Sequence, residues 1–330
     1  MKIGIDIGGT KIEACLISNE KGGSPSVLNH PELGDLCVLG RHRVPTERDR
    51  GYTHIVSNIA KCVLELLSET HQEMSSIEFI GMGLPGSVNP KNGIMYRGNT
   101  LVLEGQPLVK DLRTALNFSG QMQTENDANL FAYAETICGA GLAHEKKSGL
   151  NRNQMVGVGV IIGTGCGGGI VINGKMLKGR NGSAGEIGHL ELHENGHSCF
   201  CGQMGCAEQY VSGPAVEAAY EARRNSKNRE ILSTSQIFKA AEEGNPVAMA
   251  TLNQYKRDLG KLISKVNDFL NPDFIVLGGG VSRQPSIYNG LEAEIEHFSF
   301  VKGYVPQIYQ HQLGDSAGVI GAALMGYESK

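Results

Sequence analysis

The chain has 330 residues, a formal net charge of −4 and 40% hydrophobic residues. This length exceeds one ordinary hydrophobic core and predicts two domains, and the hydrophobic content excludes a disordered chain. The slightly acidic charge offers no basic surface for nucleic acid, and no apolar run reaches the roughly 20 residues that cross a membrane.

The first segments predict a β-hairpin. Residues 2–7 and 11–17 are apolar runs separated by the turn-forming sequence GGT. Because Asp6 interrupts the first run, we expect a strand there and not a signal peptide, and we expect a cytoplasmic protein. Residues 19–36 are rich in turn-forming residues and predict a surface loop.

Helical and strand patterns alternate through the rest of the chain. Residues 53–69 carry apolar side chains at helical spacing, and a further helix is expected over 126–140. Residues 315–326 predict a helix of small residues that Asp315 caps. The pattern over 255–271 predicts a helix with these side chains on one apolar face: Leu259, Leu262, Ile263, Val266 and Phe269.

One arrangement occurs twice. A strand, a glycine turn and a second strand are predicted over 2–17 and again over 154–173, where Asn173 and Gly174 form a hairpin turn. Two related halves that face each other across a cleft would produce this repetition.

The two glycine turns are candidate phosphate sites. Glycines after a strand expose backbone N–H groups that suit phosphate oxygens, and each turn carries a threonine, Thr10 or Thr164. Asp6 could hold Mg²⁺ directly or through water, and Lys11 adds positive charge. An ordinary hairpin explains either turn alone, whereas both turns together with Asp6 favour phosphate.

Two named phosphate motifs fit the chain poorly. The Walker pattern does not occur, and G-x-G-x-x-G occurs at 81–86 and 163–168. A dinucleotide-binding fold needs a helix after that motif. A strand follows the second occurrence and a proline interrupts the first, so the dinucleotide interpretation is disfavoured.

Three cysteines stand close together: Cys199, Cys201 and Cys206. Structural zinc takes four ligands, with thiolate and imidazole preferred, and Gly202 and Gly205 let the chain bend back between the thiols. Three histidines compete for the fourth position: His189, His193 and His197. Four protein ligands would make the metal structural, and three buried or redox-active thiols are the alternative. The remaining cysteines are scattered and expected in the core: Cys15, Cys37, Cys62, Cys138 and Cys166.

A zinc ion would order the loop over 186–208, which has few large apolar residues. Glu186 and Glu208 would then be fixed hydrogen-bond acceptors, which suits a ligand with many hydroxyl groups, such as a sugar. Either glutamate alone is more simply a solvated surface residue.

Asp127 lies at the start of the helix expected over 126–140. The simple interpretation is helix capping by the Asn-Asp pair. The functional interpretation is a general base that takes the proton of a sugar hydroxyl during phosphoryl transfer.

Six motifs occur in the order found in the ROK family of sugar kinases: IGIDIGGTK, ENDAN, IIGTGCGGG, GEIGH, CFCGQMGCAE and VLGGGVS. The chain resembles this family from Ile3 to about Met325. The resemblance implies an α/β protein with the two-lobed actin-like ATPase (ribonuclease H-like) fold, a cleft between the lobes and a structural zinc loop. The implied small lobe spans 1–124 plus about 315–330, and the implied large lobe spans 125–314.

The resemblance also implies roles for individual residues. Asp127 would be the catalytic base acting on the sugar 6-hydroxyl. The implied sugar ligands are Asn99, Asn126, Asp127, Glu186, His189 and Glu208. The implied nucleotide-binding residues are Asp6, Gly8, Gly9, Thr10, Lys11, Gly163, Thr164, Gly165, Gly167, Gly278, Gly279 and Gly280. In the family pattern His189, and neither His193 nor His197, joins Cys199, Cys201 and Cys206 as the zinc ligands.

The implied activity is ATP-dependent phosphorylation of a hexose such as fructose, mannose or glucose at its 6-hydroxyl, with Mg²⁺ and a structural Zn²⁺, in a homodimer. The motifs are similar to fructokinase/mannokinase members and to N-acetylglucosamine kinase members, which leaves N-acetylglucosamine as the alternative substrate. Residues 99–105 lack the proline and tryptophan of typical glucokinases, which disfavours glucose.

Two further functions are weaker interpretations. A sugar-sensing regulator of the same family would carry a helix-turn-helix segment, whereas only two residues precede Ile3 and no basic recognition helix is visible. A sugar-binding module without catalysis would not need Asp127 and Lys11.

Overall fold

The computed structural model describes residues 1–19, 26–89, 91–98, 100–224 and 231–327. Their contacts form two compact units. The first contains Met1–Met155, Gly169–Ala184 and Gln312–Lys330, and the second contains Val156–Gly168 and Gly185–His311. In this division residues 125–155 pack with the N-terminal part of the chain. The lobe boundary expected at residue 124 stays a prediction.

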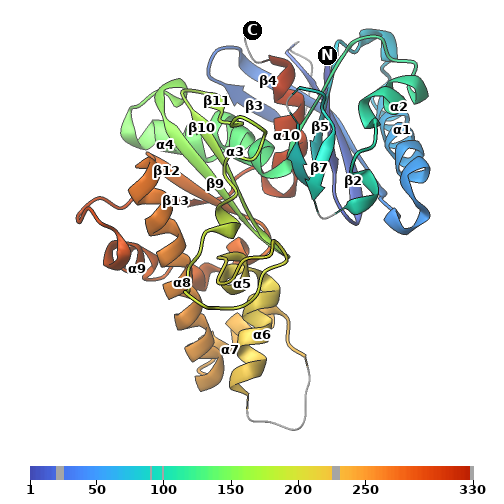
Figure 1. Cartoon of the computed structure of the whole chain (residues 1–330). Coiled ribbons are helices and arrows are strands. Elements are labelled where there is room, and N and C mark those ends of the chain that lie inside the picture. The colour runs from blue at the N-terminus through green and yellow to red at the C-terminus, as the bar shows by residue number, and fades with distance from the viewer. Residues whose placement is uncertain (20–25, 90, 99, 225–230, 328–330) are drawn as a thin grey trace. The chain divides into compact units, whose positions relative to one another are not determined.

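A six-stranded sheet forms the centre of the first unit, in the order β3-β4-β2-β1-β5-β8 (Figure 1). The strands are β1 (Lys2–Ile7), β2 (Lys11–Ser18), β3 (Val27–His30), β4 (Gly34–Pro45), β5 (Phe79–Leu84) and β8 (Gln121–Asn126). The predicted hairpin is confirmed, because β1 and β2 pair antiparallel from Lys2↔Ile17 to Ile7↔Ile12. β5 is parallel to β1, and β8 is parallel to β5.

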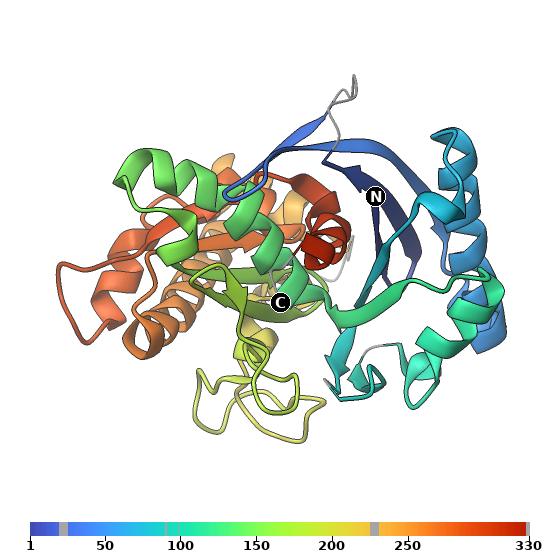
Figure 2. The same cartoon turned by 90° about the horizontal axis from the view of Figure 1, so that it is seen from above.

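Helices cover both faces of this sheet. Helices α1 (Tyr52–Glu69) and α2 (Leu108–Ala115) lie on one face, and α3 (Asp127–Cys138) and α10 (Ala317–Leu324) lie on the other (Figure 2). The predicted helix at 53–69 is confirmed as α1. The helix predicted over 126–140 ends at Cys138, and a separate helix α4 (Ala140–Ser148) follows. A two-stranded sheet of β6 (Gly86–Val88) and β7 (Met95–Gly98) completes this part of the unit.

Strand alternation explains the face that α1 covers. Alternate residues of β1, Ile3, Ile5 and Ile7, are buried in one hydrophobic cluster with residues of α1, including Ile55 and Ile59. Successive side chains of a strand point to opposite faces, so the residues between these isoleucines face α10.

Glycines on that second face let α10 approach closely. A Cβ atom at Gly4 would lie 1.9 Å from the carbonyl oxygen of Val319, and one at Gly81 would lie 1.9 Å from that of Ala322. Only a residue without a side chain fits at such a distance. The helix of small residues is therefore matched by small residues on the strands beneath it.

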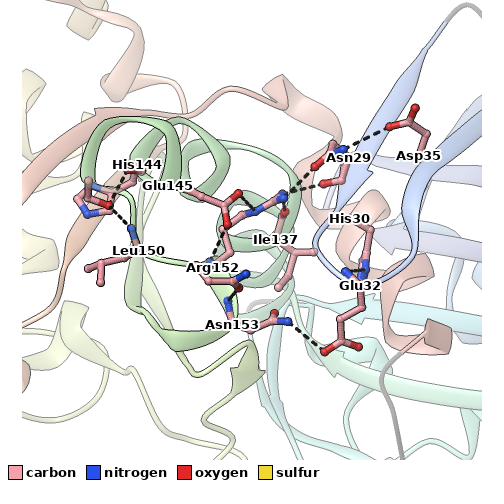
Figure 3. Close-up of polar contacts among 12 residues, drawn as sticks. Asn29, His30, Glu32, Asp35, Ile137, His144, Glu145, Leu150, Arg152 and Asn153 are labelled. Carbon is pink, nitrogen blue, oxygen red and sulfur yellow. Dashed lines mark hydrogen bonds and ion pairs between the residues drawn. The ribbon is translucent and has the colours of Figure 1, made fainter.

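The surface loop predicted over 19–36 is wrong for its second half, because β3 pairs antiparallel with β4 there; residues 20–25 lie outside the described part. A long-range contact holds this hairpin (Figure 3). The buried guanidinium of Arg152 donates to the backbone and side-chain oxygens of Asn29 at 2.8 Å and to the carbonyl of Ile137 at 2.5 Å, and pairs with Glu145 at 2.9 Å.

Three parallel strands lie in the second unit: β9 (Val156–Ile162), β12 (Phe274–Gly278) and β13 (Gln307–Gln310). The five-stranded sheet has the order β11-β10-β9-β12-β13, with β10 (Cys166–Ile172) and β11 (Lys175–Met176) antiparallel. Asn173 and Gly174 join these two strands with φ angles of 52° and 73°. The predicted hairpin turn is confirmed, because both turn residues have positive φ.

The helices of the second unit are α5 (Glu208–Val211), α6 (Gly213–Arg223), α7 (Thr234–Glu242), α8 (Pro246–Leu270) and α9 (Leu291–Phe298). The side chain of Asn245 caps α8 by accepting from the N–H groups of Val247 and Ala248 at 3.0 Å. The predicted apolar face of α8 is buried except for Phe269, which is 87% exposed near the C-terminal end. Among the described residues, no helix combines the length and apolarity needed to traverse a bilayer.

The predicted cap of the C-terminal helix is wrong. Asp315 lies inside a 3₁₀ turn, Gly314–Ser316, and α10 begins at Ala317 with Ser316 at the N-cap position. No side-chain hydrogen bond caps this helix start. The extra turn moves the start of the helix beyond the acidic residue.

We predict that Gly81→Ala lowers the free energy of unfolding by about 1–3 kcal/mol, because the new methyl group must displace the backbone of α10. Urea denaturation measures this change. Gly9→Ala is the matched control: Gly9 has no positive φ, and a Cβ there would lie 3.5 Å from Arg48 Nη1, an ordinary contact. Equal unfolding midpoints for Gly81→Ala and the unmodified protein would contradict the packing argument.

Candidate active site and metal centre

The first glycine turn joins β1 to β2 and is held at both ends. The N–H of Gly8 donates to the carbonyl of Lys11 at 2.9 Å. Thr46 donates its N–H to the carbonyl of Thr10 at 3.0 Å and its hydroxyl to the carbonyl of Gly8 at 2.7 Å. The sequence did not indicate that Thr46 contacts this turn, because Thr46 follows β4 and only the tertiary structure brings it there.

Gly9 lies in this turn with space above its Cα. Its φ is not positive, and the nearest atom to an added Cβ is 3.5 Å away. Gly163 and Gly280 also lack positive φ, and no atom lies within 4 Å of an added Cβ at either. Neither backbone conformation nor packing explains glycine at these points. Bare amides that a ligand approaches closely would explain it, so the turns fit phosphate groups.

Asp6 faces Glu13 across the hairpin. Burial raises the pKa of the Asp6 carboxyl to about 6, with a further contribution from the charge of Glu13. A bound cation would favour the ionised form, and a carboxylate oxygen is a ligand type that Mg²⁺ takes. Asp6 therefore fits the predicted place near magnesium.

Glu13 is a buried carboxylate with several partners. It is 1% exposed and accepts from the hydroxyl of Ser316 at 2.8 Å. Arg43 Nη2 lies 2.8 Å from it and Lys11 Nζ lies 3.8 Å away. These two cations compensate the buried charge, which would otherwise be costly.

The second glycine turn joins β9 to β10, and α5 contacts it. Glu208, the first residue of α5, accepts from the N–H of Cys166 at 2.8 Å through Oε2. A Cβ at Gly165 would lie 2.5 Å from the same oxygen. The carbonyl of Gly163 accepts from the N–H of Gly213 at 2.8 Å. The turn is therefore fixed by the residues that follow the cysteine loop, and Gly167 lies in β10 beyond it.

The turn after β12 has a backbone that requires glycine. Gly278 ends the strand, and Gly279 has φ of 80° with an added Cβ only 2.3 Å from the carbonyl oxygen of Ile162. This turn contacts the end of β9, directly before Gly163. The second and third predicted nucleotide turns thus lie next to each other within the second unit.

A cavity of about 900 Å³ lies in the second unit beside the second glycine turn. Thr164 and Glu208 line it, and so do residues of α6 and α8, including Ala219 and Tyr255. Two of the residues predicted to bind ligands therefore line the same cavity.

The predicted zinc ligands converge. The donor atoms of four side chains lie within 4.8 Å of one another: His189, Cys199, Cys201 and Cys206. The Sγ atoms of Cys201 and Cys206 are 3.6 Å apart, and Cys199 Sγ is 3.6 Å from His189 Nδ1. Tetrahedral zinc with Zn–S bonds of about 2.3 Å separates its sulfurs by about 3.8 Å. The four donors therefore fit a closed tetrahedral zinc site.

Electrostatics also favours a cation among these sulfurs. Burial, together with hydrogen bonds to the Cys201 and Cys199 sulfurs, raises the pKa of the Cys206 thiol to about 12. Thiolates this close would repel one another unless a cation neutralised them.

The other five cysteines are buried, as expected of small core residues.

The two competing histidines have other partners. His193 Nε2 lies 2.7 Å from Asp258 Oδ1, and the His193 ring contacts the tilted ring of Tyr210 with 4.3 Å between centroids. The His197 ring also contacts Tyr210, at 5.2 Å. Among the described residues, only His189 of the three histidines joins the cysteine cluster.

Glycines shape the cysteine loop. Gly202 and Gly205 have φ angles of 91° and 73°, so the predicted bends are confirmed. A Cβ at Gly205 would lie 1.8 Å from the carbonyl oxygen of His193. Two isolated bridges, Glu191↔Cys206 and Ser198↔Met204, draw the loop together.

The start of α3 combines capping with the predicted base. Asn126 is the N-cap, and its Oδ1 accepts from the N–H groups of Ala128 at 2.9 Å and Asn129 at 3.2 Å. Its amide nitrogen donates to the carbonyl of Gly86 at 3.0 Å. Asp127 Oδ1 also accepts from the N–H of Ala128, at 2.8 Å. The capping interpretation is confirmed for Asn126, and the role of Asp127 as a base stays a prediction.

The remaining predicted sugar ligands are spread over the chain. Glu186 is exposed and precedes the 3₁₀ turn Ile187–His189, which carries the metal-site histidine. Asn99 lies outside the described residues. Asn126 and Asp127 belong to the first unit, whereas Glu186, His189 and Glu208 belong to the second. Their role as sugar ligands stays a prediction.

A model of the ROK family matches residues 2–328. The chain belongs to the ROK family. It is 31% identical to the N-acetyl-D-glucosamine kinase of Haemophilus influenzae (strain 86-028NP), over 98% of this chain and 99% of that protein.

Two solved ROK structures are similar along nearly the whole chain. The ROK hexokinase of Thermus thermophilus is 28% identical with a TM-score of 0.77, over 99% of this chain and 98% of that one. The ROK glucokinase of Streptomyces griseus, solved with glucose and AMPPNP, is 27% identical with a TM-score of 0.76, over 98% of both chains. The α/β fold of this ROK protein is therefore the actin-like ATPase fold, as predicted.

We predict that Cys201→Ser removes the bound metal. The unmodified protein should carry about one zinc ion per chain by elemental analysis, and the variant little or none, because a hydroxyl is a poor zinc ligand. Its melting temperature should fall, since metal binding stabilises the loop it closes. Cys138→Ala, outside the cluster, is the control and should keep its zinc. The metal centre would be refuted if the unmodified protein contained no zinc and had the same melting temperature as Cys201→Ser.

We predict that Asp6→Asn stabilises the protein without added Mg²⁺. The raised pKa of Asp6 means that the folded state holds its proton up to about pH 6, whereas the unfolded chain releases it near the ordinary pKa of 3.8. Stability from the protonated form is therefore lost as pH rises from about 4 to 6. The variant should gain about 1–3 kcal/mol above pH 6 and little at pH 4. Urea unfolding across this range measures it, and a gain independent of pH would contradict the burial argument.

Proposed function

We propose that this ROK protein is an ATP-dependent kinase that phosphorylates the 6-hydroxyl of a hexose. The similarity over nearly the full length to a kinase and to a glucokinase solved with glucose and AMPPNP supports this activity. The observation that carries most weight is the unexplained glycine at Gly9 and at Gly163, each in a turn directly after a strand. Room for phosphate oxygens over both turns is what a nucleotide kinase requires.

Asp127 performs the proton transfer in this proposal. The 6-hydroxyl oxygen attacks the γ-phosphorus of ATP, the bond to the bridging oxygen of ADP breaks, and the carboxylate of Asp127 takes the hydroxyl proton. Its hydrogen bond to the N–H of Ala128 fixes one carboxylate oxygen at the start of α3. A rigid helix start holds the base in one orientation, which such catalysis needs.

The nucleotide is bound mainly by backbone in this proposal. The N–H groups of the turn over 8–10 and those over 163–165 bind phosphate oxygens, and Lys11 contributes charge. Magnesium held near Asp6 neutralises charge on the phosphates. Gly278, Gly279 and Gly280 border the adenosine side.

The metal loop orients the sugar ligands in this proposal. Zinc bound by His189 and the three cysteines supplies a rigid link in a loop with few large apolar residues. Glu208 follows Cys206 by two positions and is fixed to the N–H of Cys166. Glu186 and Glu208 then present acceptors to sugar hydroxyls, together with Asn99 and Asn126. His189, whose Nδ1 faces the metal, presents the N–H of its other ring nitrogen as a donor.

N-acetyl-D-glucosamine is the first substrate to test, because it is the substrate named for the curated relative at 31% identity. Fructose, mannose and glucose are the other candidates. The four sugars differ at carbons 1 and 2, so the choice among them depends on the residues that surround this part of the ring. Homodimer formation and a cytoplasmic location remain predictions that accompany this function.

We predict ATP-dependent phosphorylation of at least one of these four sugars in an assay that couples ADP release to NADH oxidation. Asp127→Asn should lower kcat by about 10²–10⁴-fold, because general-base catalysis contributes on this scale. Sugar affinity should remain within threefold, since the amide keeps the shape and the acceptor oxygen.

Asp35→Asn, an exposed carboxylate of the β3–β4 hairpin, is the control and should keep full turnover. An Asp127→Asn variant with unchanged kcat would remove Asp127 from the base position. If no hexose stimulates ADP release by the unmodified protein, the kinase proposal fails.

A further inference from the structure

An arginine lies directly beside the first glycine turn. Arg48 begins a 3₁₀ turn, Arg48–Arg50, that follows β4. Its Nη1 atom lies 3.5 Å from the position that a Cβ at Gly9 would occupy. The space that glycine leaves open in this turn is therefore bordered by a guanidinium group.

Arg48 differs from the other basic side chains around the turn. Lys11 and Arg43 both pair with the buried Glu13, at 3.8 Å and 2.8 Å. Arg50 pairs with Glu47 at 3.4 Å. Within the part of the chain that the structure describes, the Arg48 side chain has no hydrogen bond or ion pair, so its charge is available to a ligand.

The backbone that carries Arg48 is held in an unusual conformation. Glu47, directly before it, has φ of 48° and ψ of 47°, the left-handed region that side chains other than glycine rarely adopt. Such strain persists where surrounding contacts enforce it, and it occurs often at functional sites.

Several contacts enforce this conformation. The carboxylate of Glu47 lies 2.7 Å from His54 Nε2 and 3.4 Å from Asn58 Nδ2. Asn58 also donates to the carbonyl of Pro45 at 3.1 Å. Thr46, the residue before Glu47, holds Gly8 and Thr10 through two hydrogen bonds. The segment over 45–48 is thereby fixed to the turn and places Arg48 over Gly9.

We propose that Arg48 binds the phosphoryl group that is transferred from ATP. This inference rests on the proposed kinase function. As the sugar oxygen bonds to the γ-phosphorus and the bond to ADP breaks, negative charge spreads over the γ-phosphoryl oxygens. The guanidinium group of Arg48 donates two N–H groups to these oxygens, a geometry that arginine suits better than lysine. Arg48 then acts as a catalytic residue that stabilises this charge.

Steady-state kinetics test the role. Arg48→Ala should lower kcat by about 10²–10³-fold, the scale for removing one donor to developing charge, while KM for the sugar stays within threefold. Arg48→Lys should recover part of the loss, because it keeps the charge and loses the paired donors. Arg50→Ala is the matched control from the same 3₁₀ turn and should stay within twofold of the unmodified protein.

Nucleotide binding tests where Arg48 acts. By isothermal titration calorimetry, Arg48→Ala should lose at least tenfold in affinity for AMPPNP, which carries a γ-phosphoryl group, and less than threefold for ADP. Arg48 is exposed, so equal melting temperatures of variant and unmodified protein are expected and should be confirmed first.

The outcomes separate this inference from the kinase proposal. If the unmodified protein phosphorylates a hexose and Arg48→Ala is as active as Arg50→Ala, the role of Arg48 is wrong and the kinase proposal stands. Equal losses of affinity for ADP and AMPPNP also refute contact with the γ-phosphoryl group. If no hexose is phosphorylated but AMPPNP affinity still falls selectively, the kinase proposal fails and the phosphate contact stands. No AMPPNP binding by the unmodified protein overturns both.

Discussion

Helix α10 lies so close to β1 and β5 that a Cβ atom at Gly4 or Gly81 would fall 1.9 Å from a helix carbonyl oxygen. This close packing is the constraint on which the first unit depends, because Asp6 and Glu13 lie on the same face of the sheet, against Gly318 and Ser316 at the start of α10. At Gly9 and Gly163 glycine has the opposite role. No neighbouring atom occupies the missing side chain's place, and the backbone is left open to a ligand.

The metal centre is linked to the second glycine turn through the residues that follow the last cysteine. Three sulfurs and an imidazole nitrogen converge in a loop with few large apolar side chains. Two residues after the last cysteine, Glu208 contacts the N–H of Cys166 and so reaches the turn over 163–165. A cation at the cluster would therefore order more than its own loop, because the backbone after Cys206 supports the residues that are expected to bind substrate.

Charge at the first turn is arranged at some expense of stability. The half-buried carboxylate of Asp6 faces the buried carboxylate of Glu13, and the pKa of Asp6 is raised to about 6. A protein selected for stability alone would avoid this pair, whereas a cation such as the Mg²⁺ proposed near Asp6 would offset its charge. Lys11 and Arg43 compensate Glu13, whereas Arg48 is the cation that we propose binds the transferred phosphoryl group.

Local sequence patterns were sufficient for the hairpin of β1 and β2, for helix α1 and for the bends at Gly202 and Gly205. Each depends on residues close together in the chain, through strand alternation, helical spacing or a positive φ. The spacing of the cysteines likewise predicted a metal loop, and the order of six motifs indicated the family.

Contacts between distant residues decided the features that local patterns did not predict. Spacing left three histidines as candidate ligands, and the fold directs His193 to Asp258 and brings His189 to the sulfurs. Part of the predicted loop is a β-hairpin that pairs with β2 through β4, and Arg152, far along the chain, binds it at Asn29. Phe269 continues the apolar pattern of α8 yet is exposed, since periodicity does not show where neighbouring elements end. Thr46 and Arg48 reach the glycine turn only through strand pairing, a contact between distant residues that no local pattern encodes.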